Sequence, residues 1–474
     1  MPCFLSACAV FLTLACMSAS ETNGAEPAAA VGVDITFTAD CDGSDQRYVL
    51  VLPDGFEAAK RYSALIALHG HGSDRWQFVR DPRDECRAVR DAVAKHGLIL
   101  VSPDYRAPAS WMGPKAEEDL LQIIVSLRRN FRIEDVIICG GSMGGAGCLT
   151  FAALHPGLVD GVVSFNATAN FIEFDNFSEA IAYSFGGDKK QVSEQYRLRS
   201  AEFFPERLTM PIAFTTGGKD ESVPPHSVLR LAAALKKTNP NVLLLHDEHG
   251  GHSTSYADAA AALEFVIEKA LGNAPGAVHH FEEEIRAIEE RNRAAPPPAG
   301  AVLFTGSSSI RMWTNLAEDM KPTTVINHGF GGSQLPDVLR YMDRLIIPFE
   351  PSAIVLYCGE NDIDAGRSAQ QVADDFTTFV QYARRRGISG PIYFVSLKPS
   401  PARFARWPDF QKANALISDI CRAGKGLYYI DISAAMLGPG GRPLADIWLS
   451  DGLHMNAKGY GIWAPIIKKA IQEK

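Results

Sequence analysis

Short apolar runs alternate with helix-like patterns along two long stretches of this chain. In the first stretch, residues 34–271, we expect the apolar runs to form strands. These runs are Ser63–Leu68, Leu98–Ser102, Val136–Cys139, Gly161–Phe165, Ile212–Thr216 and Val242–Leu245. The helical patterns between them are Glu117–Arg129, Gly145–Leu154, Ser227–Lys237 and Tyr256–Leu271. Strands that alternate with helices form mostly parallel sheets covered on both faces, so this stretch predicts an α/β domain.

The alternation restarts at Ala301 and predicts a second, smaller α/β domain with a mostly parallel sheet. Its strand candidates are Ala301–Thr305, Thr324–Asn327, Ala353–Tyr357, Ile392–Ser396 and Leu427–Ile432. Its helical patterns are Gln370–Arg385, Phe410–Cys421 and Ala457–Gln472. No short-period repeat connects the two halves, so they are not a simple duplication. A length of 474 residues, too great for one typical core, also favours two domains.

The segment between the two stretches has a different composition. Breaking residues occur near Pro275, and Ala294–Gly300 contains three consecutive prolines. Between them Phe281, Ile285 and Ile288 recur at helical spacing among many charges, which predicts a solvated helix packed on the second domain. We therefore divide the chain into residues 1–25 (leader), 26–275 (first domain), 276–300 (linker and lead-in helix) and 301–474 (second domain).

The first 25 residues are typical of a secretory signal peptide. Phe4–Met17 is an uncharged apolar run too short to span a bilayer, and small residues follow it, with cleavage expected near Ser20 or Ala25. We therefore expect a secreted or periplasmic protein. A lipid anchor is not expected, because Leu5–Cys8 has the order of a lipoprotein box but lies too close to the start. Elsewhere no run is long enough for a membrane span.

Charge and cysteine spacing exclude several other functions. The net charge of −9 argues against nucleic acid as a partner, because phosphate binding needs a basic surface. The six cysteines after the leader are scattered without a C-x-x-C pair, so we expect neither a zinc site nor any other metal. Buried free thiols are the simplest interpretation, although export would permit one disulfide, using Cys41 or Cys86.

The first chemical motif is Gly140-Gly141-Ser142-Met143-Gly144, a G-x-S-x-G between a predicted strand and a helix. Glycines there let the chain turn sharply and raise the serine hydroxyl above the sheet. Ser142 needs a histidine base and an orienting carboxylate, which follow the serine in the order acid, then histidine.

Asp220 and His252 each follow a strand candidate and are the best matches for this acid and base. His249 and His246 are the rival bases, and Asp247 is the rival acid.

Two backbone N–H groups should stabilise the oxyanion at Ser142, those of Met143 and His71. We expect the side chains of His69 and His71 to be structural, bonded to backbone. Trp111 is a candidate for lining the substrate cleft, with packing an equal alternative.

Four fragments in order mark a second site. They are Gly306-Ser307-Ser308-Ser309, Asn327–Ser333, Gly359-Glu360-Asn361-Asp362 and Asp451-Gly452-Leu453-His454. Each fragment is weak alone, but four in order at strand ends are specific.

These motifs resemble two hydrolase families. Residues 34–271 resemble the α/β-hydrolase family, notably its secreted esterase and polyhydroxybutyrate-depolymerase-like branch. Residues 279–472 resemble the SGNH (GDSL-like) hydrolase family, although Ser307 stands where that family commonly has Asp.

The SGNH resemblance implies a flavodoxin-like parallel sheet in the second domain and the following roles at the second site. Ser308 would be the nucleophile, His454 the base and Asp451 the carboxylate that orients it. The N–H groups of Ser308 and Gly332 would form the oxyanion hole with the Asn361 amide. Arg311 and Trp313 could line this site or simply pack, and Lys398 ends a strand where it could contact substrate or be exposed.

Together the resemblances imply a secreted serine esterase that removes acetyl or other acyl groups from carbohydrate at two independent sites, without a metal or organic cofactor. The rivals are a lipase, thioesterase, polyester depolymerase or general acyl esterase, and one domain acting only as a binding module. A lipase would want a long apolar lid, whereas Asn170–Tyr196 is rich in charges and glycine. A peptidase of the prolyl-oligopeptidase type would usually add a propeller domain.

Overall fold

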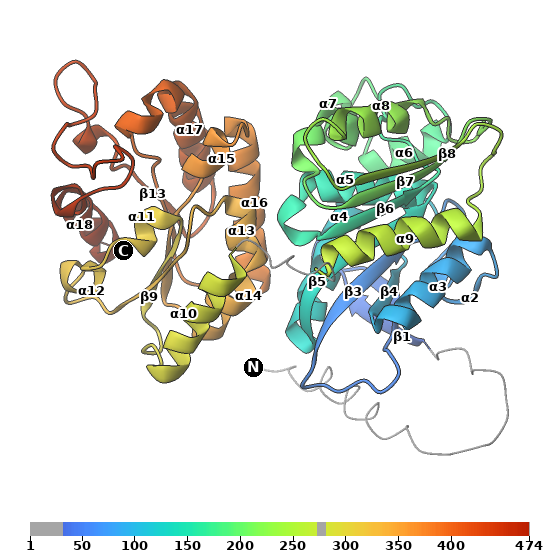
Figure 1. Cartoon of the computed structure of the whole chain (residues 1–474), viewed down its shortest axis with the longest axis horizontal. Coiled ribbons are helices and arrows are strands. Elements are labelled where there is room, and N and C mark those ends of the chain that lie inside the picture. Colours follow the sequence, from blue (N-terminus) through green and yellow to red (C-terminus); the bar gives the residue numbers. More distant parts are fainter. Residues whose placement is uncertain (1–31, 273–280, 474) are drawn as a thin grey trace.

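The computed structural model describes residues 32–272 and 281–473 and contains two α/β domains side by side (Figure 1). The predicted signal peptide lies outside the described residues. Each domain has its own sheet, of eight strands in the first and five in the second. The predicted two-domain α/β fold is therefore confirmed.

The first sheet has the order β1-β2-β4-β3-β5-β6-β7-β8 and is parallel except at one edge, where β1 and β2 run antiparallel to their neighbours. Its strands are β1 (Val33–Thr38), β2 (Asp45–Val51), β3 (Arg61–Leu68), β4 (Ile99–Pro103), β5 (Arg132–Gly141), β6 (Gly161–Phe165), β7 (Ile212–Gly217) and β8 (Val242–Asp247). All six predicted strands are present. The sequence patterns missed β1, whose apolar residues alternate with polar ones at the solvated edge, and β2, which begins with three polar residues before a buried apolar run.

Helices cover both faces of this sheet because successive strand residues point to opposite sides. Leu65 belongs to the apolar cluster that includes residues of α3 and α9, and its neighbour Ile66 belongs to the cluster on the other face, which includes residues of α4, α5 and α8. The helices are α2 (Gln77–Arg80), α3 (Asp84–His96), α4 (Pro114–Asn130), α5 (Met143–Leu154), α6 (Ser178–Phe185), α7 (Ser193–Leu198), α8 (His226–Leu235) and α9 (Tyr256–Ala270).

The second sheet is wholly parallel, in the order β10-β9-β11-β12-β13. Its strands match the five predicted ones: β9 (Val302–Gly306), β10 (Val325–Gly329), β11 (Ala353–Tyr357), β12 (Ile392–Val395) and β13 (Leu427–Ile430). One face packs on α10 (Glu282–Ala294), α13 (Leu335–Arg340), α14 (Met342–Leu345), α16 (Ala369–Arg385) and α17 (Trp407–Ala423). The other packs on α11 (Ser308–Arg311), α12 (Leu316–Asp319) and α18 (Ala457–Gln472), while α15 (Glu360–Asp364) follows β11.

The lead-in helix α10 packs on the second domain, as its apolar edge predicted. Ile285 and Ile288 are buried, and the Phe281 ring meets the Phe330 ring edge-on at 5.2 Å. Arg344 of α14 adds ion pairs to Glu282 and Glu289 of the helix.

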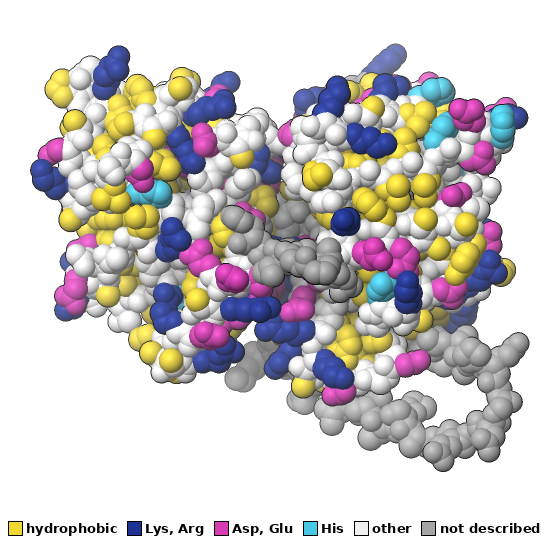
Figure 2. Space-filling model, viewed as in Figure 1, with side chains coloured by type: hydrophobic (Ala, Val, Ile, Leu, Met, Phe, Trp, Pro, Cys, Tyr) yellow, Lys and Arg dark blue, Asp and Glu magenta, His cyan; other side chains and the backbone are white. Residues whose placement is uncertain are grey.

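The two domains share one continuous apolar cluster, in which α13 packs on the turn that follows α5 and α16 lies against α4. Ion pairs cross the same boundary, including Arg207 to Asp374 at 2.7 Å and Arg340 to Asp135 at 2.9 Å. Figure 2 shows side chains of both charges gathered where the domains adjoin. Apolar burial and ion pairing together hold the two domains against each other.

All six cysteines after the leader are free thiols, and only Cys41 is exposed. Within residues 32–272 and 281–473, every helix is too short or too polar to cross a lipid bilayer.

Candidate functional sites

Ser142 lies on a sharp turn between β5 and α5. Its φ of 57° and ψ of −118° are unusual for a residue with a side chain, and such strain is typical of functional turns. The neighbouring glycines make the turn possible. A Cβ on Gly144 would lie 2.0 Å from the Leu68 carbonyl oxygen, so only glycine fits there.

The structure brings Asp220 and His252 together beside this turn. His252 Nδ1 lies 2.6 Å from Asp220 Oδ2, and the buried carboxylate also accepts the N–H groups of Ser222 and Val223. These bonds hold the carboxylate in place, and the carboxylate orients the imidazole.

The rival residues lie elsewhere. His246 bonds to Thr216, and Asp247 accepts the backbone N–H of His249. In the described part of the chain no hydrogen bond joins His252 to Ser142, and such bonds commonly tighten only when substrate binds.

Two backbone segments, the start of α5 and the loop after β3, lie beside Ser142. Met143 is the first residue of α5, where N–H groups have no helical partner. A Cβ on Gly70 would lie 3.9 Å from the Ser142 Cβ, which brings the Gly70–His71 peptide beside the nucleophile. The two N–H groups predicted for the oxyanion hole therefore come from segments that flank Ser142.

Trp111 is fully buried, which corrects its assignment as a residue that lines the cleft. Its indole Nε1 donates to His71 Nδ1 at 3.3 Å, and its ring packs against Phe171, Phe174 and Phe177. Trp111 therefore supports His71 from beneath. Partial burial also lowers the pKa of His71, which favours the neutral ring that can accept this bond.

Several large apolar side chains are exposed on the segment that joins β6 to β7. They are Ile172, Phe177, Tyr183 and Phe203. The Phe177 ring also contacts the His71 ring, with centroids 4.7 Å apart. Phe177 therefore places an exposed aromatic ring next to His71 at the first site.

The second site is a continuous hydrogen-bonded chain of three side chains. Ser308 begins α11 after β9, and its Oγ lies 2.9 Å from His454 Nε2. His454 Nδ1 in turn lies 2.6 Å from Asp451 Oδ2. Ser307 and Ser309 are buried whereas Ser308 is partly accessible, so only Ser308 combines the base with access.

Hydrogen bonds within its own turn fix the Asp451 carboxylate. Its Oδ1 accepts the N–H groups of Leu453 and His454, each at 2.9 Å. The bond from the His454 side chain, with these backbone bonds, lowers the pKa of Asp451 to about 2. The carboxylate is therefore ionised whenever His454 must be oriented and stabilised as a cation.

The groups predicted to form the oxyanion hole of this site are the Ser308 N–H, the Gly332 N–H and the Asn361 amide. The Ser308 N–H opens α11 and has no helical partner. A Cβ on Gly332 would lie 3.9 Å from Asn361 Nδ2, so the Gly332 backbone and the Asn361 amide adjoin each other.

The two residues predicted to contact substrate in this domain, Arg311 and Trp313, differ in exposure. Arg311 is half-exposed on α11 and pairs with Glu284 of α10 at 3.2 Å. Trp313 is only 1% exposed, which corrects its assignment as a substrate-binding residue. Its Nε1 donates to Asp319, and its ring stacks on Tyr460 within the core.

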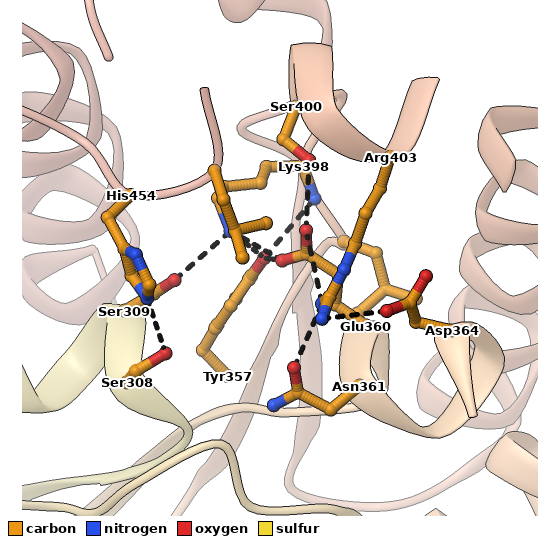
Figure 3. A network of polar contacts seen from close by, with 12 residues as sticks. Ser308, Ser309, Tyr357, Glu360, Asn361, Asp364, Lys398, Ser400, Arg403 and His454 are labelled. Carbon is orange, nitrogen blue, oxygen red and sulfur yellow. Dashed lines mark hydrogen bonds and ion pairs between the residues drawn. The ribbon is translucent and has the colours of Figure 1, made fainter. Parts of the chain in front are cut away.

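A buried polar network behind the second site was missed by the sequence patterns (Figure 3). Lys398 is neither exposed nor a substrate contact, because it is 1% exposed and forms a close ion pair with buried Glu360. Lys398 Nζ also bonds to Ser309 Oγ and Tyr357 OH. Burial raises the pKa of the Glu360 carboxyl, but Lys398 outweighs burial and lowers it.

Comparison with protein families gives a match in each half of the chain. Residues 298–462 match the GDSL-like Lipase/Acylhydrolase family, and residues 112–269 match the Prolyl oligopeptidase family. Both matches agree with the resemblances read from the motifs, and within the α/β-hydrolase fold the matching family is the prolyl oligopeptidase family. None of the curated proteins matches the chain.

Solved structures resemble one domain at a time. An esterase of Pyrococcus furiosus is 17% identical over 51% of this chain and 93% of its own, with a TM-score of 0.38. A candidate acylhydrolase of Bacteroides fragilis is 20% identical over 40% of this chain and 95% of its own, with a TM-score of 0.36.

A third structure, a candidate dipeptidyl aminopeptidase IV of Bacteroides ovatus, is 15% identical with a TM-score of 0.41. The match covers 51% of this chain but only 36% of that one, so the chain spans about a third of that protein's length. Each domain of the chain thus contains a region that matches a hydrolase family, residues 112–269 the Prolyl oligopeptidase family and residues 298–462 the GDSL-like Lipase/Acylhydrolase family.

Proposed function

We propose that this protein is an exported serine esterase that removes acyl groups from carbohydrate through two independent Ser-His-Asp sites. The observation that carries the proposal is the chain from Ser308 Oγ to His454 to Asp451, at 2.9 and 2.6 Å. These distances are those over which a base takes a serine proton and a carboxylate orients the base.

At the second site, His454 Nε2 takes the Ser308 proton as Oγ attacks the ester carbonyl carbon. The oxyanion of the tetrahedral intermediate receives hydrogen bonds from the N–H groups of Ser308 and Gly332 and from the Asn361 amide. The C–O bond then breaks, and the alcohol leaves with the proton from His454. Water, deprotonated by His454, attacks the acyl-enzyme and releases the acid.

The first site runs the same cycle with Ser142 as nucleophile, His252 as base and Asp220 as its orienting carboxylate. Support comes from the strained turn at Ser142 and the 2.6 Å contact between His252 and Asp220. The N–H groups of Met143 and His71 receive the oxyanion there. The two cycles share no residue, which supports independent sites.

The leader sequence supports export, and analogy with the two families supports a carbohydrate substrate. Two different acyl hydrolases in one chain suit a substrate that carries more than one ester, as acylated polysaccharides do. The exposed Phe177 ring beside the first site suits either a sugar ring or an apolar acyl group.

A second candidate function applies to Ser142 alone. The match of residues 112–269 to the Prolyl oligopeptidase family favours cleavage of peptides, and the same serine chemistry acts on amides. Under this alternative the first site would cleave peptide p-nitroanilides faster than esters, while the Ser308 site would still hydrolyse esters.

Single and double serine variants test the proposal. We expect Ser142→Ala and Ser308→Ala each to retain part of the hydrolysis of p-nitrophenyl acetate and acetylated xylan, and the double variant to lose it. Total loss in either single variant would contradict independent sites and would favour one domain as a binding module. Cleavage of long-chain esters without acetylated xylan would overturn the carbohydrate assignment. An acyl chain-length series on each single variant then assigns the acyl group.

A further inference from the structure

We infer that Arg403 is a positioning residue for the second site, where it holds the Asn361 amide so that one N–H faces the oxyanion. The inference rests on the proposed function of Ser308. It concerns a residue with no place in the four motifs, on a 3-10 helix at Pro401–Arg406.

The Asn361 amide is held at both ends. Its Oδ1 accepts a hydrogen bond from Arg403 Nη1 at 2.9 Å, and its Nδ2 donates to the Ser333 carbonyl at 3.0 Å. A flipped amide would point its oxygen at the Ser333 carbonyl and its N–H groups at the guanidinium, so both contacts would become repulsive. An amide nitrogen carries two hydrogens, which leaves the second N–H for the reaction.

Arg403 is itself held in place. Its Nη2 pairs with Asp364 Oδ2 at 2.9 Å, and its Nη1 lies 3.8 Å from Glu360 Oε1 (Figure 3). Glu360 is fixed in turn by Lys398 and by Ser400 Oγ. The guanidinium therefore sits between two carboxylates and has little freedom to leave the amide.

The segment that carries Arg403 also touches the loop of the base. The Ala402 N–H donates to the Gly452 carbonyl at 3.0 Å, and Gly452 lies between Asp451 and His454. The same short helix thus contacts the loop of the acid–base pair and, through Arg403, the oxyanion donor. A rigid link between these groups is what a preorganised oxyanion hole requires.

The Arg403 cation also polarises the amide. A charged donor on Oδ1 withdraws electron density from Nδ2 and makes its free N–H a stronger donor. Loss of the guanidinium should therefore weaken oxyanion stabilisation without removing Asn361. Because removing a whole oxyanion donor costs about 10²- to 10³-fold in kcat, we expect Arg403→Ala to lower kcat by about 10- to 100-fold with KM little changed.

The test uses the full chain with Ser142→Ala, so that hydrolysis of p-nitrophenyl acetate reports Ser308 alone. In this background we compare Arg403→Ala, Asn361→Ala and the double variant. If Arg403 acts through Asn361, Arg403→Ala lowers kcat strongly when Asn361 is present and hardly at all when it is absent. Arg403→Lys, which keeps one cationic donor, should recover part of kcat.

Arg406→Ala is the matched control, because Arg406 is an exposed arginine on the same helix. It should leave kcat and KM unchanged. Thermal unfolding identifies variants that fail to fold, and Arg403→Lys and Arg403→Gln carry the test if Arg403→Ala is one of them.

Three outcomes would overturn the inference. They are a kcat within twofold of the background for Arg403→Ala, a change in KM alone, and an equal loss of kcat with and without Asn361. A failure of the proposed function is separate, because Ser308→Ala would then leave hydrolysis in this background unchanged.

Discussion

Replacing Lys398 by methionine should strongly destabilise the second domain. Lys398 and Glu360 are 1% and 3% exposed and form a close ion pair. Without the ammonium, the Glu360 carboxylate keeps its bonds from Tyr357 and Ser400 but loses its closest cation. Removing one partner of a buried pair costs about 3–5 kcal/mol, because the remaining charge is left in a low-dielectric interior. We expect Lys398→Met to lower the free energy of unfolding of the second domain by an amount in this range.

The assay is urea-induced loss of p-nitrophenyl acetate hydrolysis with Ser142→Ala as background, so that the transition reports the second domain. Glu360→Gln keeps an acceptor for Tyr357 and removes the charge. The double variant Lys398→Met/Glu360→Gln should therefore lose at least about 2 kcal/mol less than the sum of the single variants. A cost below about 1 kcal/mol for Lys398→Met, or additive losses, would refute the view that this ion pair neutralises a buried charge.

Three further predictions concern other parts of the molecule. Gly144→Ala would place a Cβ 2.0 Å from the Leu68 carbonyl, so the first site should lose reaction with a fluorophosphonate probe while the second keeps it, as mass spectrometry of peptides would show. Arg340→Ala removes an ion pair across the domain boundary to buried Asp160. We expect calorimetry to show that the free energy of unfolding falls by about 3 kcal/mol, and an unchanged unfolding profile would contradict this prediction. Burial lowers the pKa of His328 from 6.5 to about 4, so the unfolded chain takes up a proton that the folded chain excludes, and stability should fall by about 3 kcal/mol as pH drops from 6.5 to 4. His328→Gln should flatten that decline in urea titrations at several pH values.

Most of the strands that sequence patterns predicted are buried on both faces, and the edge strand β8 was predicted from its continuous apolar run. β7 begins with the apolar residues Ile212, Ala213 and Phe214 and is buried along its whole length, because helices cover both of its sides. β1 was missed because half of its residues face solvent and its pattern resembles an irregular polar segment. A continuous apolar run therefore leaves a strong sequence signal, and the alternating pattern of β1 leaves a weak one.

At the candidate sites, contacts between residues close in sequence could be predicted, and contacts between distant residues could not. Asp451 and His454 are three residues apart, so a single turn brings them together and the sequence suffices to suggest the pair. Arg403 and Asn361 are 42 residues apart, and only the packing of the short helix against α15 brings them into contact. Trp313 illustrates the converse, because its position near the Ser308 motif did not reveal that the ring faces the core.

The central claim is that the chain contains two independently activated serines. Intact-mass spectrometry after saturation with a fluorophosphonate probe tests it most directly, because such probes react with activated serine hydroxyls. We predict two adducts on the wild-type chain, one on Ser142→Ala, one on Ser308→Ala and none on the double variant. A single adduct on the wild-type chain, or loss of all labelling in either single variant, would contradict the claim.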